Sequence, residues 1–207
     1  MENQEQAKPV RGQNLLEWYE ALISAALVLV LIFSFFFRII QVDGRSMVPT
    51  LTHGDKLIVW AAGYTPQRGD VVIVDGTEAH LFSDPEQTQV VEKKGIGINL
   101  IKRVIAVAGD QLDIDFTAGT VTLNGVVQKE DYINMLTTRN DGAFTYPLTV
   151  PEGYIFVMGD NRNASTDSRS TLVGLVPEDA VIGHAVYRFA RDEKLRSTWA
   201  EQFSVID

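Results

Sequence analysis

The hydropathy pattern is dominated by one uninterrupted apolar stretch near the N-terminus. Residues 21–37 read ALISAALVLVLIFSFFF, without a charge and with two serines as the only polar side chains. With Trp18 and Tyr19 before it and Ile39–Ile40 behind it, the stretch has about 20 residues, enough for a helix to cross a hydrocarbon core of about 30 Å. The aromatic pair and Arg38 stand where interfacial anchors are expected. The pattern therefore predicts a transmembrane helix.

Two other interpretations of this stretch are a buried core helix and a cleaved secretory signal. A core helix of this length would have a polar face, which is absent here. A cleaved signal would end in small residues, whereas this run ends in Phe35-Phe36-Phe37-Arg38. An uncleaved anchor is favoured. Basic residues lie on both sides of it, so charge alone does not set its orientation.

The rest of the chain alternates between short β-branched runs and turns that contain Gly or Asp, which is typical of a β-rich domain. Asn124-Gly125 predicts a hairpin turn. We expect no regular structure in residues 1–14, an inserted loop or hairpin at Glu78–Asn99 and a short helix at Asp192–Phe203. The predicted strands are Lys56–Trp60, Asp70–Val74, Ile101–Val107, Gln111–Asp115, Thr120–Leu123, Tyr154–Met158 and Val181–Phe189.

Composition excludes several classes of function. The net charge of −9 argues against a nucleic-acid partner, because phosphate binding needs clustered Lys and Arg. The chain has no cysteine, so disulfides, zinc–thiolate sites and cysteine nucleophiles are excluded.

The first segment that could carry chemistry is Gly44-Arg45-Ser46-Met47-Val48-Pro49-Thr50-Leu51. Pro49 stiffens the turn, and Gly44 permits close approach of backbone just before Ser46. A serine in such a turn is sterically open, and neighbouring N–H groups can converge on an oxyanion. Most serines in turns only make local hydrogen bonds, so this segment alone is weak evidence for a nucleophile.

A serine nucleophile needs a base, and the chain offers three histidines. His53 lies in a turn, His80 in the polar insertion and His184 on a predicted strand. None has the Gly-x-Ser-x-Gly context of a Ser-His-Asp triad, so that triad is disfavoured.

Lys102 is the alternative base. On the predicted strand Ile101–Val107 it shares a face with the apolar Val104 and Ala106, and with Leu100 just before the strand, because successive residues of a strand point to opposite sides. Desolvation lowers the pKa of a lysine and makes it a base, and Ser-Lys pairs are an established form of nucleophile activation. The alternative is a lysine that reaches solvent from a strand edge.

The third segment is Gly159-Asp160-Asn161-Arg162-Asn163-Ala164-Ser165-Thr166-Asp167-Ser168-Arg169. It follows an apolar strand and is dense in hydrogen-bonding side chains, so Asx turns and an Asp–Arg pair can fix its shape. A plain connecting loop would not explain its two Asp and two Arg with Ser and Asn between them.

Together, these segments resemble the type I signal peptidases, in the short form found in Gram-positive bacteria. The anchor is followed in order by Ser-Met-x-Pro-Thr, Arg-Gly-Asp-Val-Val at Arg68–Val72, Lys-Arg-Val and Gly-Asp-Asn-Arg. The chain departs from the family pattern at Ala164, where Asn is common, and at Gly44, where some members have a serine that supplies an oxyanion donor.

The resemblance implies a mostly β protein with a single N-terminal transmembrane helix and one β-rich catalytic domain of the signal-peptidase type. It implies that Ser46 is the nucleophile, Lys102 the general base and Ser165 the residue that orients the lysine. The backbone N–H of Ser46 would supply one oxyanion donor, and that of Gly44 the other. Asp167 and Arg169 would form an ion pair behind the site, and Val42, Leu51 and Ile101 would line pockets for small substrate residues.

The domain boundaries that follow are a cytoplasmic tail at 1–17, an anchor at 18–38 and an extracytoplasmic protease domain at 39–207. The expected partners are the signal peptides of secretory preproteins and the lipid bilayer; no cofactor and no metal is expected. The enzyme would cut after Ala-x-Ala. Two alternatives are a self-cleaving repressor-type Ser-Lys protease, which would have a DNA-binding segment in place of the anchor, and a non-catalytic membrane-tethered β-domain that acts as a binding module.

Overall fold

A computed structural model describes residues 11–189 and 203–206, and the chain divides into two units, Met1–Phe37 and Arg38–Asp207. The first unit contains the α-helix α1 (Arg11–Phe36). Our expectation of no regular structure in residues 1–14 is wrong for 11–14, where the helix has already begun; residues 1–10 lie outside the described part.

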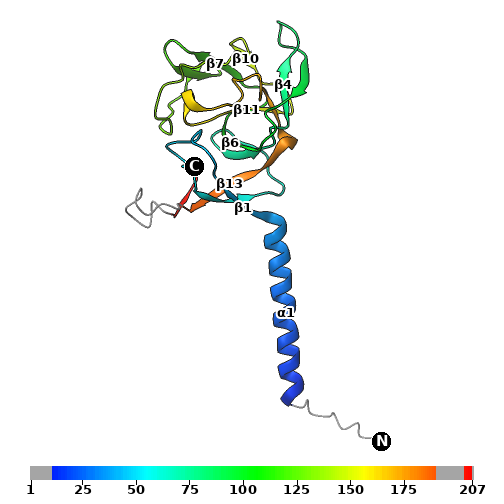
Figure 1. Ribbon diagram of the computed structural model, residues 1–207. Helices are drawn as coiled ribbons and strands as arrows, with labels where there is room; N and C mark the ends of the chain where they lie inside the picture. Colours follow the sequence, from blue (N-terminus) through cyan, green and yellow to red (C-terminus); the bar gives the residue numbers. More distant parts are fainter. Residues whose placement is uncertain (1–10, 190–202, 207) are drawn as a thin grey trace, which may run out of the picture. The chain divides into compact units, whose positions relative to one another are not determined.

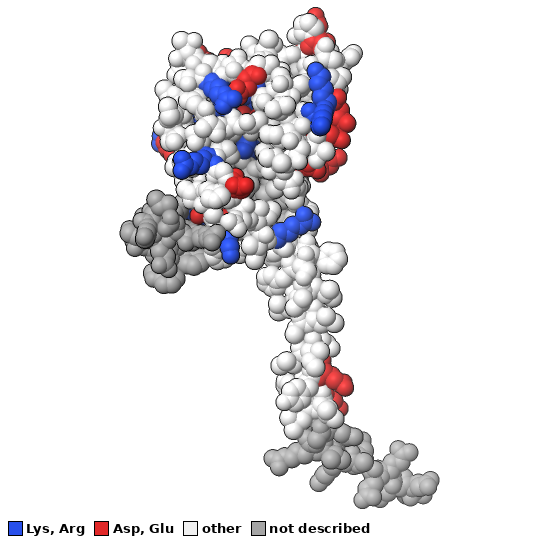
Figure 2. All heavy atoms as spheres, viewed as in Figure 1, with Lys and Arg blue, Asp and Glu red and all other residues white. Residues whose placement is uncertain are grey.

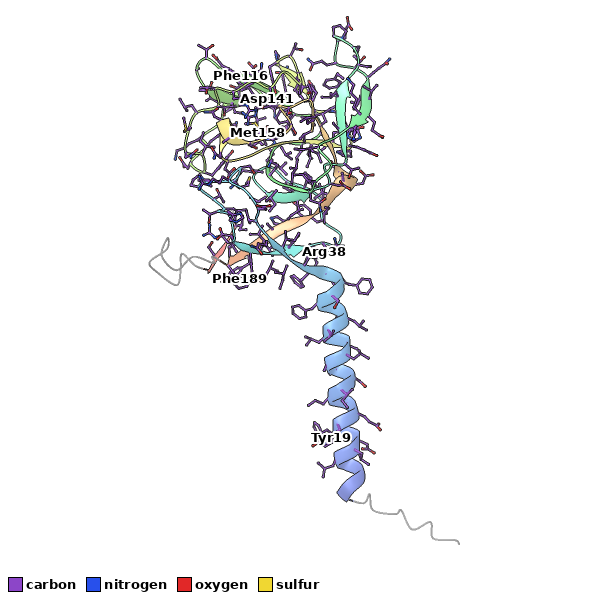
Figure 3. All side chains as sticks on the ribbon, in the orientation of Figure 1. Tyr19, Arg38, Phe116, Asp141, Met158 and Phe189 are labelled. Carbon is purple, nitrogen blue, oxygen red and sulfur yellow. The ribbon has the colours of Figure 1, made fainter. Side chains whose placement is uncertain are left out.

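Within α1, Leu15–Phe36 is long and apolar enough to cross a membrane, with a mean hydropathy of 2.2 and no buried residues. Its side chains point outward all round, as Tyr19 does in Figure 3. A helix that is apolar on every face has no stable environment in water, so this exposure is consistent with a lipid-facing anchor.

The second unit is built of strands (Figure 1). All seven predicted strands are confirmed, five of them with identical bounds at Lys56–Trp60, Gln111–Asp115, Thr120–Leu123, Tyr154–Met158 and Val181–Phe189. The strands are β1 (Phe37–Gln41), β2 (Lys56–Trp60), β3 (Val71–Val74), β4 (Glu78–Phe82), β5 (Val90–Lys94), β6 (Leu100–Ala106), β7 (Gln111–Asp115), β8 (Thr120–Leu123), β9 (Val126–Val127), β10 (Leu148–Thr149), β11 (Tyr154–Met158), β12 (Val176–Pro177), β13 (Val181–Phe189) and β14 (Phe203–Val205). Two short 3₁₀ helices, η1 (Arg162–Ala164) and η2 (Glu178–Ala180), complete the described elements.

The largest sheet has the order β1-β2-β13-β3-β6-β11-β12, and β14 pairs with β13. A second sheet, β10-β7-β8-β9, lies at the other end of the domain, and β4 pairs with β5 at its side (Figure 1). The turn at Asn124-Gly125 joins β8 to β9, and both residues have positive φ, which confirms the predicted hairpin turn. The chain folds this way because its apolar runs are short and are separated by turns, which suits antiparallel pairing.

The insertion at Glu78–Asn99 is the hairpin β4–β5, the second of the two forms that we expected for it. The predicted helix at Asp192–Phe203 falls on residues 192–202, outside the described part, while Phe203 begins a strand. The core lies on both sides of the large sheet. One apolar cluster, which includes Met158 (labelled in Figure 3), packs between that sheet and the β7–β10 sheet, and another includes Met47 and Leu57.

Candidate active site

Ser46 lies in a turn that the Gly159–Asn161 segment fixes in place. The backbone N–H of Asn161 donates to the Ser46 carbonyl at 2.9 Å, and its side-chain amide donates to the Arg45 carbonyl at 3.1 Å. The hydroxyl of Thr50 donates to the Asp160 carboxylate at 2.5 Å. Residues that are more than 100 positions apart in the sequence therefore set the position of the serine.

Lys102 reaches this serine from the middle of β6. Its Nζ is 2.9 Å from the Ser46 Oγ and 2.9 Å from the Ile101 carbonyl oxygen. The side chain is only 2% exposed. Burial lowers the pKa of Lys102 to about 8, although the carboxylates of Asp167 and Asp160 act in the opposite direction. An amine with this pKa is neutral in an appreciable fraction of molecules near pH 7, which lets it accept a proton.

Two backbone N–H groups near Ser46 have different surroundings. The Ser46 N–H donates to no residue of the described part. Gly44 has φ +98°, and its N–H donates to Nδ1 of His53 at 3.3 Å. The Ser46 N–H is thus available for an oxyanion, whereas the Gly44 N–H would first have to leave His53.

Ser165 lies beside Ser46, and only Gly159 separates them. A Cβ built on Gly159 would lie 2.3 Å from the Ser165 Oγ and 2.4 Å from the Ser46 carbonyl oxygen. Ser165 is buried, and among the described residues its Oγ makes no hydrogen bond of normal geometry, although it lies near enough to Asp167 to help lower the pKa of that carboxyl. The expected hydrogen bond from Ser165 to Lys102 is therefore not formed here.

Asp167 and Arg169 form a fully buried ion pair directly behind Ser165. Nε and Nη2 of Arg169 donate to the two carboxylate oxygens of Asp167 at 2.9 and 2.8 Å, and the Gly159 N–H donates to the same carboxylate at 2.9 Å. Burial by itself raises the pKa of Asp167, but its hydrogen bonds and ion pair with Arg169 lower it by more. The pair is thus ionised and fixes the backbone of Gly159.

A second buried pair, Arg103–Asp160, is one that sequence reasoning missed. Nε and Nη2 of Arg103 donate to Asp160, both at 2.9 Å, and its Nη1 donates to the Gly69 carbonyl at 2.6 Å. The Arg103 guanidinium also lies 4.2 Å from the centre of the Tyr132 ring. The sequence carried a signal for this pair, because Arg103 follows Lys102 in the Lys-Arg-Val box and Asp160 follows Gly159, so both belong to motifs already noted.

A groove of about 220 Å³ opens beside Ser46 and Lys102. Val42 and Ile101, which we expected to contact substrate, line it together with Ile98. Leu51 does not line the groove; it is fully buried in the apolar cluster with Met47. The residues that line the groove are Ile40, Gln41, Val42, Asp43, Gly44, Ser46, Met47, Ile73, Ile98, Asn99, Leu100, Ile101 and Lys102.

None of the three histidines makes a hydrogen bond with Ser46 among the described residues. His53 is next to Asp43, His80 is on the β4–β5 hairpin, and His184 stacks on Tyr64 at 4.9 Å between ring centres. The base within reach of the serine hydroxyl is therefore an amine. A hydroxyl, an amine of lowered pKa and a free N–H around a groove have the chemistry needed for acyl transfer.

Comparison with known proteins identifies relatives of this chain. The family described as "Signal peptidase, peptidase S26" matches residues 15–190. The chain is 39% identical to "Probable signal peptidase I-1" of Synechocystis over 81% of this chain and 79% of that protein, and 33% identical to "Signal peptidase I" of Bacillus licheniformis over 91% and 95%. A crystal structure of a signal peptidase I from Enterococcus faecalis is 29% identical, with a TM-score of 0.42, over 58% of this chain and 97% of that one.

A family match of this extent, together with relatives above 30% identity over most of their length, is sufficient to assign the chain to a family. The chain belongs to the signal peptidase I family of serine endopeptidases, peptidase S26.

Proposed function

We propose that this protein removes signal peptides from secretory preproteins with Ser46 as nucleophile and Lys102 as general base. The observation that carries the proposal is the 2.9 Å hydrogen bond between the Lys102 Nζ and the Ser46 Oγ, inside a site that lowers the pKa of the amine to about 8. Membership of the signal peptidase family supports the same reaction.

In the proposed reaction, neutral Lys102 takes the proton of the Ser46 hydroxyl while the Ser46 Oγ attacks the carbonyl carbon of the scissile bond. The negative charge on the carbonyl oxygen is stabilised by the Ser46 N–H and by the Gly44 N–H, once substrate replaces His53 as its acceptor. The protonated lysine then gives its proton to the leaving amine, which leaves an ester at Ser46. Lys102 next deprotonates a water molecule, which attacks the ester carbonyl, and the protonated lysine returns the proton to the Ser46 oxygen as the ester bond breaks.

The groove supports a preference for small side chains. Its volume of about 220 Å³ is shared between a peptide backbone and its side chains, and Val42 and Ile101 narrow it. We propose that the substrate binds as an extended strand with small residues at positions −1 and −3, consistent with cleavage after Ala-x-Ala. Replacing Ala by Leu at −1 of a test peptide should lower kcat/KM by at least about 100-fold.

The apolar helix supports membrane anchoring, and we propose that the 39–207 domain acts at the outer face of the membrane, with the tail at 1–17 in the cytoplasm. Protease added to intact spheroplasts should digest the domain. Protection of the domain until the membrane is opened would contradict this orientation.

The central test is cleavage of a preprotein-derived peptide by wild type and by Ser46→Ala. The variant should retain its fold and lose at least about 10⁴-fold in kcat/KM, because only background hydrolysis remains without the nucleophile. Turnover by Ser46→Ala within about tenfold of wild type would rule out Ser46. Absence of cleavage by folded wild type would instead favour a non-catalytic binding module.

A further inference from the structure

The β4–β5 hairpin carries three side chains whose possible metal-ligand atoms lie close together. Glu78 and His80 are two residues apart on β4 and so lie on the same face, and Glu92 of β5 is the direct cross-strand partner of His80. An imidazole nitrogen and one carboxylate oxygen from each glutamate lie within 4.8 Å of one another.

The backbone of His80 is held firmly and its ring packs against Tyr154, but among the described residues one ring nitrogen lacks a hydrogen-bond partner. Its backbone N–H donates to the Val173 carbonyl at 3.2 Å, and its carbonyl accepts from the Leu175 N–H at 2.8 Å. The residue is 91% buried, with a relative exposure of 9%, and its Nδ1 has no hydrogen-bond partner within the described ranges. Buried polar nitrogens are nearly always satisfied, so a ring in this state points to a missing ligand.

Among the described residues, the two glutamates also have no ion-pair partner. Lys94 lies opposite Glu78 across the hairpin, yet neither Glu78 nor Glu92 is within ion-pair distance of any described basic group. Glu78 and His80 line a hollow of about 200 Å³, to which Asp75 and Asp179 contribute further acidic groups. Figure 2 shows acidic side chains on this side of the domain with basic ones beside them. Residues 75–94 carry five acidic and two basic side chains, and this excess of negative charge favours a cation.

We propose that Glu78, His80 and Glu92 bind a divalent transition-metal ion. Zn²⁺ is the ion that this set of ligands suits best. One imidazole and two carboxylates suit Zn²⁺ better than Ca²⁺ or Mg²⁺, which prefer oxygen ligands alone. Three protein ligands leave a position for water in a tetrahedral shell. The 173–175 segment holds the His80 backbone on both sides, and the centre of the Tyr154 ring lies 5.6 Å from that of the imidazole, so the backbone and ring of His80 are both held by neighbours other than the ion.

A metal ion at this place would join β4 to β5 and act on stability rather than on the chemical step. The hairpin leads from β3 to β6, and residues 98–99, just before β6, line the groove beside Ser46. Ordering the hairpin would therefore steady one wall of the groove, although neither Ser46 nor Lys102 is a ligand of the ion. Zinc binding is measured without peptide, so a failure of this site can be distinguished from a failure of the proposed cleavage.

The experiment is isothermal titration calorimetry of ZnCl₂ into the full chain, purified in detergent without a histidine tag and treated with chelator. We expect one saturable site. Glu78→Gln and Glu92→Gln keep the shape of the side chains and remove one ligand charge each, so each should weaken binding by about tenfold or more. Glu86→Gln removes the same charge from the exposed tip of the same hairpin and should bind as wild type does.

Three outcomes would overturn the site: no saturable binding, equal affinity in Glu92→Gln and Glu86→Gln, or loss of the site in His53→Ala. X-ray absorption of the zinc-loaded protein should show one imidazole nitrogen with oxygen ligands, and a shell of oxygens alone would exclude His80. Because the variants are made at exposed glutamates, loss of binding cannot come from unfolding of a buried position, and thermal melts of each variant without zinc should coincide.

Discussion

Gly159 packs against Ser46 so closely that a Cβ on it would lie 2.4 Å from the Ser46 carbonyl oxygen. The same Cβ would lie 2.3 Å from the Ser165 Oγ. Since the Gly159 N–H also donates to Asp167, the glycine cannot move away without breaking a buried hydrogen bond. The position of the proposed nucleophile therefore depends on the absence of a side chain at residue 159.

Gly159→Ala should lower kcat/KM by about 100-fold or more, because a displacement of about 1 Å at Ser46 is enough to misalign the attack. A matched control is Gly183→Ala in β13, whose Cβ would lie 2.5 Å from the Trp60 carbonyl oxygen, away from the serine. Both variants should lose stability, but activity per folded molecule should fall only in Gly159→Ala. Equal specific activities in the two variants would contradict the role of Gly159.

The pH profile should report the amine of Lys102. As the proposed base, Lys102 must be neutral in the free enzyme, so kcat/KM should rise with pH and level off above about 8, the lowered pKa of the amine. Lys102→Arg should be inactive at every usable pH, because the guanidinium stays protonated. His53→Ala, His80→Ala and His184→Ala should keep this profile. An active Lys102→Arg enzyme would reopen the search for the base.

Lys102 should also make the fold less stable than its apolar variants. Its folded pKa of about 8 lies below the ordinary value of 10.5, so the unfolded chain binds more protons between these values and stability rises with pH across that window. Two and a half pKa units correspond to about 3 kcal/mol. Lys102→Met should therefore raise the melting temperature at pH 7 and remove the rise between pH 8 and 10.5. An unchanged slope would contradict the assignment of that pKa.

The Arg103–Asp160 pair should be essential for folding. Asp160→Asn leaves a buried guanidinium without its counter-charge, at a cost of about 3–5 kcal/mol. The comparison is Asp131→Asn, which breaks an ion pair to Lys129 in which both side chains are more than 70% exposed and should leave the melting temperature nearly unchanged. The melting temperatures of the two variants should be measured by thermal unfolding in the same detergent. Similar melting temperatures would show that the buried pair is dispensable.

Ser165→Ala should give an intermediate loss of activity, smaller than that of Ser46→Ala, if Ser165 orients the amine without transferring a proton. The loss should be in kcat rather than in KM, and Ser165→Thr should restore part of it, because the hydroxyl returns. An activity equal to wild type would show that the hydroxyl has no part in positioning Lys102. The test is needed because the Ser165 Oγ makes no hydrogen bond of normal geometry among the described residues.

The strands were predictable because each is a β-branched run between turns. This pattern can be recognised from neighbouring residues alone, without knowledge of contacts to distant parts of the chain. Val181–Phe189 is such a run, and it was predicted to the residue. The motifs likewise predicted which residues meet, since Ser46 and Lys102 lie within hydrogen-bond distance. The signal was weaker for β4, whose Glu78 and His80 interrupt the apolar pattern, so the sequence left open whether that segment is a loop or a hairpin.

The remaining features depend on contacts that no local pattern encodes. Arg103 is buried because Asp160, the Gly69 carbonyl and Tyr132 surround it, and these groups come from three separate parts of the chain. The family resemblance implied that Leu51 contacts substrate, yet the turn directs it into the core. The bond between Gly44 and His53 joins residues nine positions apart through a turn whose shape depends on Asn161.

The neighbours Lys102 and Arg103 make β6 sensitive to its length. Because adjacent residues of a strand face opposite sides, the amine reaches Ser46 while the guanidinium reaches Asp160. One residue inserted between the two cations would turn both toward the same side, and one of the two contacts would be lost. Single-codon insertions in β6 should therefore inactivate the enzyme, whereas the β4–β5 hairpin, which leaves β3 and returns to the adjacent β6, can change length without shifting either strand.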